Sequence, residues 1–378
     1  MVTYGSSKPE DRAEILDFAN MVFSMAHRPH NFAEVLPKVY AEGAPLYRPD
    51  MHYIAKADGR ITGLVAMLPI PMRVCGQELT VGYIGTVSTH PYYRSQGAMK
   101  ALMGLMLDDA KRLGFAYLSL GGRRQRYGYF GFTNAGMKTS HHIEGPNVRH
   151  GLSGVDSSRM VFRQITDNGD PLLDDIFAMY DRLPVSGART RDTFLIISQS
   201  WGCSLHAVMW DGDCVGWAIT DNHGIEVALS NPDELARPFM KAWHEAHGDY
   251  TLAVPLHDLA LQREAMSVSE DFDIGSEGMI NVVDWQKTLS ALLALKRLTH
   301  PLQNGQWTIQ IEDGQPLTLE VTGHSTRVDR DGRPADVRFT KAQAQDAIFS
   351  REALILPTAG APSGWFPLSL GIRGADKF

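Results

Sequence analysis

The sequence has few cysteines and no long apolar run, and these absences narrow the class of protein. Its 378 residues include only Cys75, Cys203 and Cys214, which stand alone and form no CxxC pair. An odd number of isolated cysteines argues against a disulfide framework and against a zinc–thiolate site. No apolar stretch approaches the ~18 residues of a membrane-crossing helix. We therefore expect a protein without disulfides, a bound metal or membrane contact.

Excess positive charge is also missing. The 43 acidic residues outnumber the 36 basic residues and give a net charge of −7. This balance argues against nucleic acid as a partner and is compatible with a cationic substrate such as an amine. Residues 1–5 become polar at once, without the apolar core of a signal peptide. We therefore expect a cytoplasmic protein.

The first part of the chain alternates between helical and strand periods. Helices are predicted over residues 9–23 and 32–40, and strands over 52–57 and 61–68 join at Asp58-Gly59, a strong hairpin signal. Pro69 and Pro71 are expected to interrupt the second strand. A strand ending at Thr89, a loop, a helix over 98–113 and a strand over 116–120 follow. This order predicts a parallel strand pair around a crossover helix.

A second stretch repeats this pattern. Strands over 205–210 and 214–220 join at Asp211-Gly212, and a strand over 224–229, a helix over 232–247 and a strand over 250–254 follow. Both hairpins contain the spacing DGxxxG, which predicts an internal repeat of one α/β unit. The remainder predicts a small α+β unit, with helices over 283–298 and 341–350. We therefore expect domains at 1–150, 151–282 and 283–378.

The strongest chemical signal lies where the strand ending at Thr89 meets the next helix. The segment reads His90-Pro91-Tyr92-Tyr93-Arg94-Ser95-Gln96-Gly97-Ala98-Met99. A helix N-terminus offers free backbone N–H groups and positive dipole charge, which suit a pyrophosphate. Gly97 allows close approach to the backbone, and Arg94 adds a cation. A strand–helix loop that holds an Arg and a Gly by chance is the alternative interpretation.

This segment resembles the acyl-CoA pyrophosphate loop of the GNAT superfamily of N-acetyltransferases, whose pattern is Gln or Arg, two residues, Gly, one residue, then Gly or Ala. Met99 departs from the last position, and a larger residue there is associated with the enhanced-intracellular-survival (Eis) branch. The segment Gly121-Gly122-Arg123-Arg124-Gln125-Arg126-Tyr127-Gly128-Tyr129-Phe130-Gly131-Phe132 is similar to a segment of that branch.

The resemblance implies the architecture of the whole chain. It implies an α/β (α+β) fold class, in which two tandem GNAT folds with mixed twisted sheets precede a sterol-carrier-protein-like α+β domain. The second unit is expected to be catalytically silent, because its equivalent junction, residues 230–236, lacks glycine and carries Asp233 and Glu234. The family, whose members are hexameric, also implies a homo-oligomer.

The resemblance implies direct acetyl transfer from acetyl-CoA, the co-substrate, to the amine of a small molecule or a Lys side chain. Tyr127 is the implied acid that protonates the CoA sulfur, and the terminal carboxylate of Phe378 is the implied base. The implied CoA-binding residues are Val87, Ser88, Thr89, Arg94, Ser95, Gln96, Gly97, Ala98, Met99 and Gly122.

Other interpretations remain open at this stage. Tyr127 can be a core aromatic residue, and Phe378 can be a loose terminus. His244 and His247 have a spacing that metal ligands use, but a surface helix explains them without a metal. A different class of function is a non-catalytic acyl-CoA-binding or lipid-binding scaffold, which Met99 favours because it departs from the pyrophosphate pattern.

Overall fold

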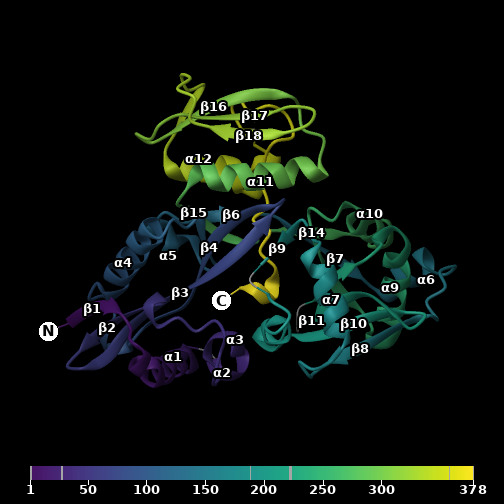
Figure 1. Ribbon diagram of the computed structural model, residues 1–378, viewed down its shortest axis with the longest axis horizontal. Helices are drawn as coiled ribbons and strands as arrows, with labels where there is room; N and C mark the ends of the chain where they lie inside the picture. Colours follow the sequence, from purple (N-terminus) through teal and green to yellow (C-terminus); the bar gives the residue numbers. More distant parts are fainter. Residues whose placement is uncertain (1, 27–28, 188, 221–223, 357, 378) are drawn as a thin grey trace.

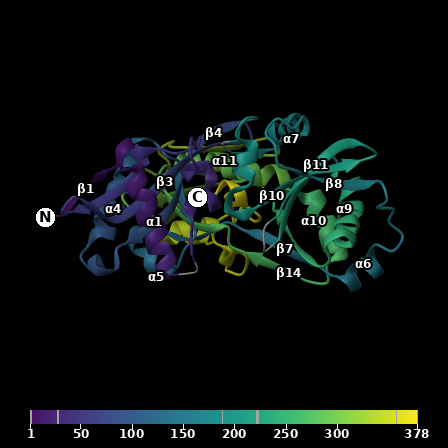
Figure 2. The ribbon, with the colours of Figure 1, turned by 90° about the horizontal axis from the view of Figure 1, so that it is seen from below.

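The computed structural model describes residues 2–26, 29–187, 189–220, 224–356 and 358–377 (Figure 1). These residues form three sheets with helices packed against them, which confirms a mixed α/β fold class. The first and second sheets lie at opposite ends of the long axis in both views (Figures 1 and 2), and the third lies above them in Figure 1. Within the described residues, no helix has the length and apolar character that crossing a membrane requires.

The first sheet has the strand order β1–β2–β3–β4–β5–β15–β6, and β9 adds to β3. Its strands are β1 (Val2–Ser6), β2 (His52–Ala57), β3 (Arg60–Val74), β4 (Gln77–Thr89), β5 (Tyr117–Leu120), β6 (Thr133–Ala135), β9 (Val185–Ser186) and β15 (Gly278–Val282). Its helices are α1 (Arg12–Ala26), α2 (Phe32–Val35), α3 (Pro37–Tyr40), α4 (Ala98–Arg112) and α5 (Arg124–Tyr127). Strands β4 and β5 are parallel, as predicted, and α4 is their crossover helix.

The second sheet has the order β14–β7–β13–β12–β11–β10–β8. Its strands are β7 (Lys138–Ile143), β8 (Met160–Ile165), β10 (Ser204–Trp210), β11 (Asp213–Thr220), β12 (Ile225–Leu229), β13 (Tyr250–Pro255) and β14 (Phe272–Gly275). Its helices are α6 (Gly145–Gly151), α7 (Leu172–Asp181), α8 (Phe194–Ser198), α9 (Pro232–His247) and α10 (Leu259–Val268).

The first two sheets have the same strand order through their central part. In each, an antiparallel hairpin pairs with a third strand, and a helix then crosses to a parallel neighbour. Both hairpins turn on residues with positive φ, at Asp58 (50°) and Gly59 (78°) and at Asp211 (52°) and Gly212 (91°). Positive φ at two successive residues is the geometry of a type I′ turn, so the Asp-Gly hairpin signals are confirmed.

The two sheets exchange a strand across the expected boundary at residue 150. Strand β7 precedes that boundary but pairs with β13 and β14 of the second sheet. Strand β15 forms the end of the expected second unit, residues 151–282, but lies between β5 and β6 of the first sheet. The exchange ties the two sheets together, because each contains a strand whose nearest neighbours in sequence belong to the other.

The third sheet has the order β18–β17–β16–β19. Its strands are β16 (Gly305–Ile311), β17 (Leu317–Val321), β18 (Thr326–Asp329) and β19 (Val337–Phe339), with helices α11 (Trp285–Thr299) and α12 (Lys341–Phe349). In Figure 1 both helices lie on the side of this sheet that faces the rest of the molecule. The chain then returns as a buried tail, in which Trp365, Leu368 and Leu370 have no exposed surface, to end between the first two sheets (Figure 1).

Two local predictions were wrong. Pro69 and Pro71 do not interrupt β3, which continues to Val74 and pairs with β4 throughout. Both prolines lie beyond Ala66, the last residue of β3 that pairs with β2. The N–H that each proline lacks therefore removes no hydrogen bond between β3 and β2. The helix predicted over 32–40 is two short helices, because Pro37 cannot donate within a helix and starts a new one.

Candidate active site

The junction between β4 and α4 lines an open cavity of about 480 Å³. Six of the residues predicted to bind CoA meet there, namely Thr89, Arg94, Ser95, Gly97, Ala98 and Met99. The same cavity is lined by Tyr93, Lys100, Arg126, Tyr129 and Phe130. We call it the loop cavity.

The backbone of the loop cavity is shaped for an anion. Ser95 (φ 63°) and Gly97 (φ 86°) have left-handed backbone conformations, and α4 begins at the next residue, Ala98. Among the described residues, no side chain caps the N-terminus of this 15-residue helix. Its first N–H groups and its positive dipole end are therefore available, and Arg94, Lys100 and Arg126 add cationic charge. This combination suits a ligand with phosphate groups.

Four predicted CoA-binding residues do not line the loop cavity. The Ser88 hydroxyl is buried and donates to the carbonyl of Thr86 (3.1 Å), and the Gln96 amide donates to the carbonyl of Tyr92 (3.1 Å). Val87 packs against the buried cluster around α4. A Cβ at Gly122 would lie 2.4 Å from Cε2 of Tyr127, so Gly122 packs directly on that ring.

The edge of β4 toward β5 opens beyond Ile84. The last β4–β5 pair is Ile84 with Leu120, whereas β4 continues to Thr89 and stays paired with β3 on its other side. Residues 85–89 therefore offer backbone groups to a ligand rather than to a strand. The predicted backbone role of Val87 and Thr89 falls on this open edge.

A β-bulge at Thr86 (φ 46°) is fixed by a buried network of hydrogen bonds. Tyr40 from α3 lies 2.9 Å from the Thr86 hydroxyl and 3.1 Å from Nε2 of His52. Nδ1 of His52 lies 2.7 Å from the carbonyl of Arg48, so Nδ1 carries the proton and Nε2 accepts from Tyr40. Burial lowers the pKa of His52 to about 4.

Acid is expected to destabilise the protein through His52. His52 binds a proton near pH ~6.5 in the unfolded chain but only near pH 4 in the folded chain. The free energy of unfolding therefore falls as the pH drops through this window. The free energy of unfolding should fall by ~2 kcal/mol from this group between pH 7 and 4.5. Urea unfolding of the wild type and His52→Gln at both pH values checks this. An equal pH dependence in the two proteins would contradict it.

Tyr127 ends α5 and is buried, with 7% of its surface exposed. Its ring meets Phe132 edge-to-face at 6.4 Å and belongs to the cluster of apolar residues around α4. It does not line the loop cavity, although its neighbours Arg126 and Tyr129 do. Burial raises the pKa of Tyr127, so its hydroxyl stays protonated at neutral pH and can act as a proton donor.

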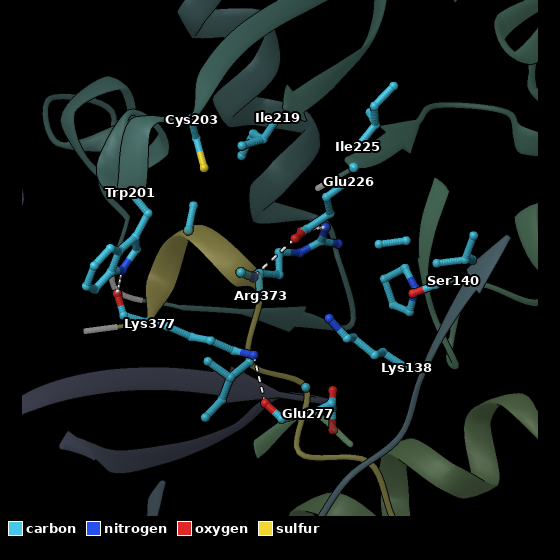
Figure 3. Close-up of a pocket in the computed structure, with 18 of the residues that line it drawn as sticks. Lys138, Ser140, Trp201, Cys203, Ile219, Ile225, Glu226, Glu277, Arg373 and Lys377 are labelled. Carbon is cyan, nitrogen blue, oxygen red and sulfur yellow. Dashed lines mark hydrogen bonds and ion pairs between the residues drawn. The ribbon is translucent and has the colours of Figure 1, made fainter. Parts of the chain in front are cut away.

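A second cavity, of about 410 Å³, lies between the first two sheets (Figure 3). We call it the inter-sheet cavity. Its walls come from β4, β7, β11, β12 and β13, and the buried C-terminal tail closes one side with residues 371–375 and Lys377. Tyr83 of β4 lines this cavity, and its hydroxyl lies 3.6 Å from a Cβ built at Gly121. Gly121 therefore lies beside the Tyr83 hydroxyl at the inter-sheet cavity, and the next residue, Gly122, packs on the ring of Tyr127.

The C-terminal tail is fixed beside the inter-sheet cavity by side chains from both halves. Nζ of Lys38, fully buried on α3, donates to the carbonyls of Ala375 (2.5 Å) and Lys377 (2.6 Å). Nε1 of Trp201 donates to the same Lys377 carbonyl (3.3 Å). Nε of the fully buried Arg189 contacts Asp376 at 2.7 Å. Phe378, the predicted base, lies outside the described residues, but the residue before it is held between the two sheets.

Sequence reasoning did not find Lys38, Tyr83 or Arg189. Each is an isolated residue in a segment without a recognisable motif, and each reaches the site only because distant segments pack together. Burial of a charged side chain such as Lys38 is rare and would indicate that it holds a partner in place. The sequence alone does not show which lysine is buried.

The acidic junction and the two histidines singled out in the sequence all lie on or beside helix α9. Helix α9 begins at Pro232 with Asp233 and Glu234 in its first turn, so the second sheet has an acidic junction where the first has a cationic one. His244 contacts Asp249 (2.8 Å), whereas the His247 ring stacks on Trp243 with centroids 4.2 Å apart. The two histidines therefore face different partners.

Residues 3–135, about a third of the chain, match a protein family described as an acetyltransferase (GNAT) domain. Comparison with curated proteins gives no match. Solved structures share the fold over most of the chain. A probable N-acyltransferase from Enterococcus faecalis is 16% identical, with a TM-score of 0.61, covering 91% of this chain and 89% of its own.

Two further structures are similar over nearly the whole chain. A GCN5-related N-acetyltransferase from Anabaena variabilis is 14% identical, with a TM-score of 0.63, covering 95% of this chain and 93% of its own. Eis1 from Mycobacterium abscessus is 14% identical, with a TM-score of 0.61, covering 100% and 99%. At these identities the likeness shows the fold alone. The family match covers residues 3–135, and the fold shared with these solved structures extends over nearly the whole chain.

Proposed function

We propose that the protein transfers the acetyl group of acetyl-CoA directly to a primary amine. The observation that carries the proposal is the loop cavity, in which an uncapped helix N-terminus and three cations lie next to the open edge of β4. The loop would hold the CoA pyrophosphate, and the backbone of Val87 and Thr89 would hold the pantetheine arm. No step in this reaction requires a metal.

The acetyl transfer needs a base before attack and an acid after it. The ammonium loses a proton to the base, the amine nitrogen bonds to the thioester carbonyl carbon, and the carbon–sulfur bond breaks. Tyr127 gives its proton to the departing sulfur, and the second proton that the attacking nitrogen loses restores the Tyr127 hydroxyl, so the products are the N-acetylated amine and CoA. The terminal carboxylate of Phe378 is the proposed base. The anchoring of Lys377 between the sheets supports this role.

We also propose that the first two sheets are tandem GNAT folds at residues 1–150 and 151–282, and that residues 283–378 are a sterol-carrier-protein-like domain. The shared strand order and the two matching Asp-Gly turns support the repeat. The acidic first turn of α9 supports a silent second unit, because it would repel a pyrophosphate. A cytoplasmic homo-oligomer, with a hexamer as the candidate assembly, completes the proposal.

Gly97→Glu should weaken acetyl-CoA binding by ~10-fold or more, a loss of ~1.4 kcal/mol. The change puts a β-carbon on a residue with φ 86° and a negative charge at the anion site. Isothermal titration with acetyl-CoA checks it. Gly104→Glu is the matched control, because it adds the same charge on the same helix where a Cβ meets nothing within 4 Å. No binding to the wild type, or equal binding to the Gly97 variant, would reject the proposal.

A non-catalytic acyl-CoA-binding or lipid-binding scaffold is the second candidate. It is favoured by Tyr127, which packs in the core and lines neither cavity described above. Extending the chain by one residue after Phe378 separates the two candidates. An enzyme that uses this carboxylate should lose CoA release from acetyl-CoA and an amine, whereas a scaffold should show no release before or after the extension.

A further inference from the structure

One wall of the loop cavity is a segment that leaves the first sheet between β5 and β6. We call residues 121–132 the wall segment, and its residues Arg126, Tyr129 and Phe130 line the cavity. Its secondary structure is the single turn of α5 and a 3₁₀ turn at Gly128–Phe130. Helices this short are not stable without tertiary contacts. The position of this wall therefore depends on what packs against the segment.

Two successive backbone carbonyls of the wall segment accept hydrogen bonds from side-chain amides. Nδ2 of Asn281, on β15, donates to the carbonyl of Phe130 (2.7 Å). Nε2 of Gln345, on α12, donates to the carbonyl of Gly131 (3.0 Å). Gly131 has a φ of 78°, and a Cβ there would lie 3.2 Å from Nδ2 of Asn281. Glycine therefore suits both the turn and the close approach of this amide.

Each amide is turned toward its carbonyl by a second group that can only donate. Nζ of Lys341, the first residue of α12, donates to Oδ1 of Asn281 (2.6 Å). Burial lowers the pKa of Lys341 to about 8, so its amine stays mostly protonated at pH 7. Oε1 of the fully buried Gln345 accepts from the backbone N–H of Val282 (2.8 Å). With its oxygen fixed in this way, each amide must present its NH₂ group to the wall segment.

Two further contacts join α12 to the same stretch of chain. Arg124, in α5, lies 3.3 Å from Asp346. The N–H of Gly136, just after β6, donates to the carbonyl of Phe349 at the end of α12 (2.8 Å). Figure 1 shows α12 between the third sheet and the pair β15 and β6. Contacts to the wall segment and to β6 thus run along the whole length of α12.

We propose that Lys341 and Gln345 are positioning residues for acetyl-CoA, through which α12 holds the wall segment in place at the loop cavity. The inference rests on the proposed binding of acetyl-CoA in that cavity. Neither residue lines the cavity, so each acts through another group, Lys341 through the Asn281 amide and Gln345 through the Gly131 carbonyl. Both lie outside residues 3–135, the range of the family match. The acyl-donor site is therefore completed by a helix of the third sheet.

Lys341→Met tests the inference on the full chain by isothermal titration with acetyl-CoA. Without the ammonium, the Asn281 amide is free to turn away from the Phe130 carbonyl, so the Kd should rise by ~10-fold, about the contribution of one hydrogen bond to a charged group. Lys341 is only partly buried, so the variant should fold. Lys287→Met is the matched control and should keep the wild-type Kd. Its Nζ, on α11, also donates to the first unit, but to the Gly114 carbonyl (3.4 Å), outside the wall segment.

Gln345→Met removes the bond to Gly131 and should also raise the Kd for acetyl-CoA. Because Gln345 is fully buried, this variant needs a control for lost stability. Ile348→Val leaves a small cavity on the same buried face of α12, so it should lower the Tm and leave the Kd unchanged. A rise in Kd that is as large for Ile348→Val would show that affinity follows stability alone, and it would overturn the inference.

A double-mutant cycle with Asn281→Leu tests the route through the amide. If Lys341 acts through Asn281, the double variant should bind acetyl-CoA no more weakly than Asn281→Leu alone. A Lys341→Met variant with the wild-type Kd, or two effects that multiply in the double variant, would overturn this inference and leave the proposed function standing. A wild type that binds no acetyl-CoA would contradict the proposed function itself.

Discussion

Replacement of Tyr127 by phenylalanine is expected to lower the rate of acetyl transfer by ~10²- to 10⁴-fold, the usual contribution of a positioned general acid. The ring would keep its contacts with Phe132 and Gly122, so the loop cavity should stay intact. The affinity for acetyl-CoA should therefore change little, and kcat should carry the loss. Steady-state CoA release and isothermal titration measure the two quantities separately.

Tyr53→Phe is the control for the loss of a buried hydroxyl. Tyr53 belongs to the same apolar cluster as Tyr127, and its hydroxyl donates to Asp109 (3.0 Å). A loss of stability without a loss of turnover is expected for this variant. If Tyr127→Phe behaves in the same way, Tyr127 is a core aromatic residue, and Tyr83, whose hydroxyl lies beside Gly121, becomes the next candidate for the acid.

The local parts of the fold could be predicted because their causes are local. The type I′ turns at Asp58-Gly59 and Asp211-Gly212 depend on two residues each, and the crossover helix α4 depends on one apolar stripe. The loop cavity could be predicted for the same reason, since Thr89 to Met99 form one continuous segment at one junction. Six of the predicted binding residues meet there for that reason.

The inter-sheet cavity could not be predicted from the sequence, because it depends on pairings between distant segments. Strand β7 lies in the second sheet only because its partners β13 and β14 are there, more than a hundred residues later. Lys138 therefore reaches a wall opposite Arg373, far from it in sequence. No periodicity or spacing in one sequence indicates which of several similar strands will pair, so this part of the site needed the structure.

Arg189→Met is expected to release the tail and to destabilise the protein by ~3–5 kcal/mol. Arg189 is fully buried, contacts Asp376 at 2.7 Å and Ser198 at 3.0 Å, and lies near the rings of Tyr180 and Phe194. The variant leaves the Asp376 carboxylate, 7% exposed, without its cation. Removing one partner of a buried pair leaves an uncompensated charge, which costs far more than the pair contributes. The Tm and the rate of proteolysis near the tail should both report it.

The double variant Arg189→Met/Asp376→Leu separates charge from position. Replacing both partners by apolar residues is often neutral or stabilising, so the Tm should recover towards that of the wild type. Arg263→Met, which breaks the exposed contact with Asp233 (3.0 Å), should cost no more than ~1 kcal/mol. If the tail supplies the base, Arg189→Met should also lose turnover while it keeps acetyl-CoA affinity, because the loop cavity lies on other segments. A single variant that keeps both its Tm and its turnover would show that Arg189 does not position the tail.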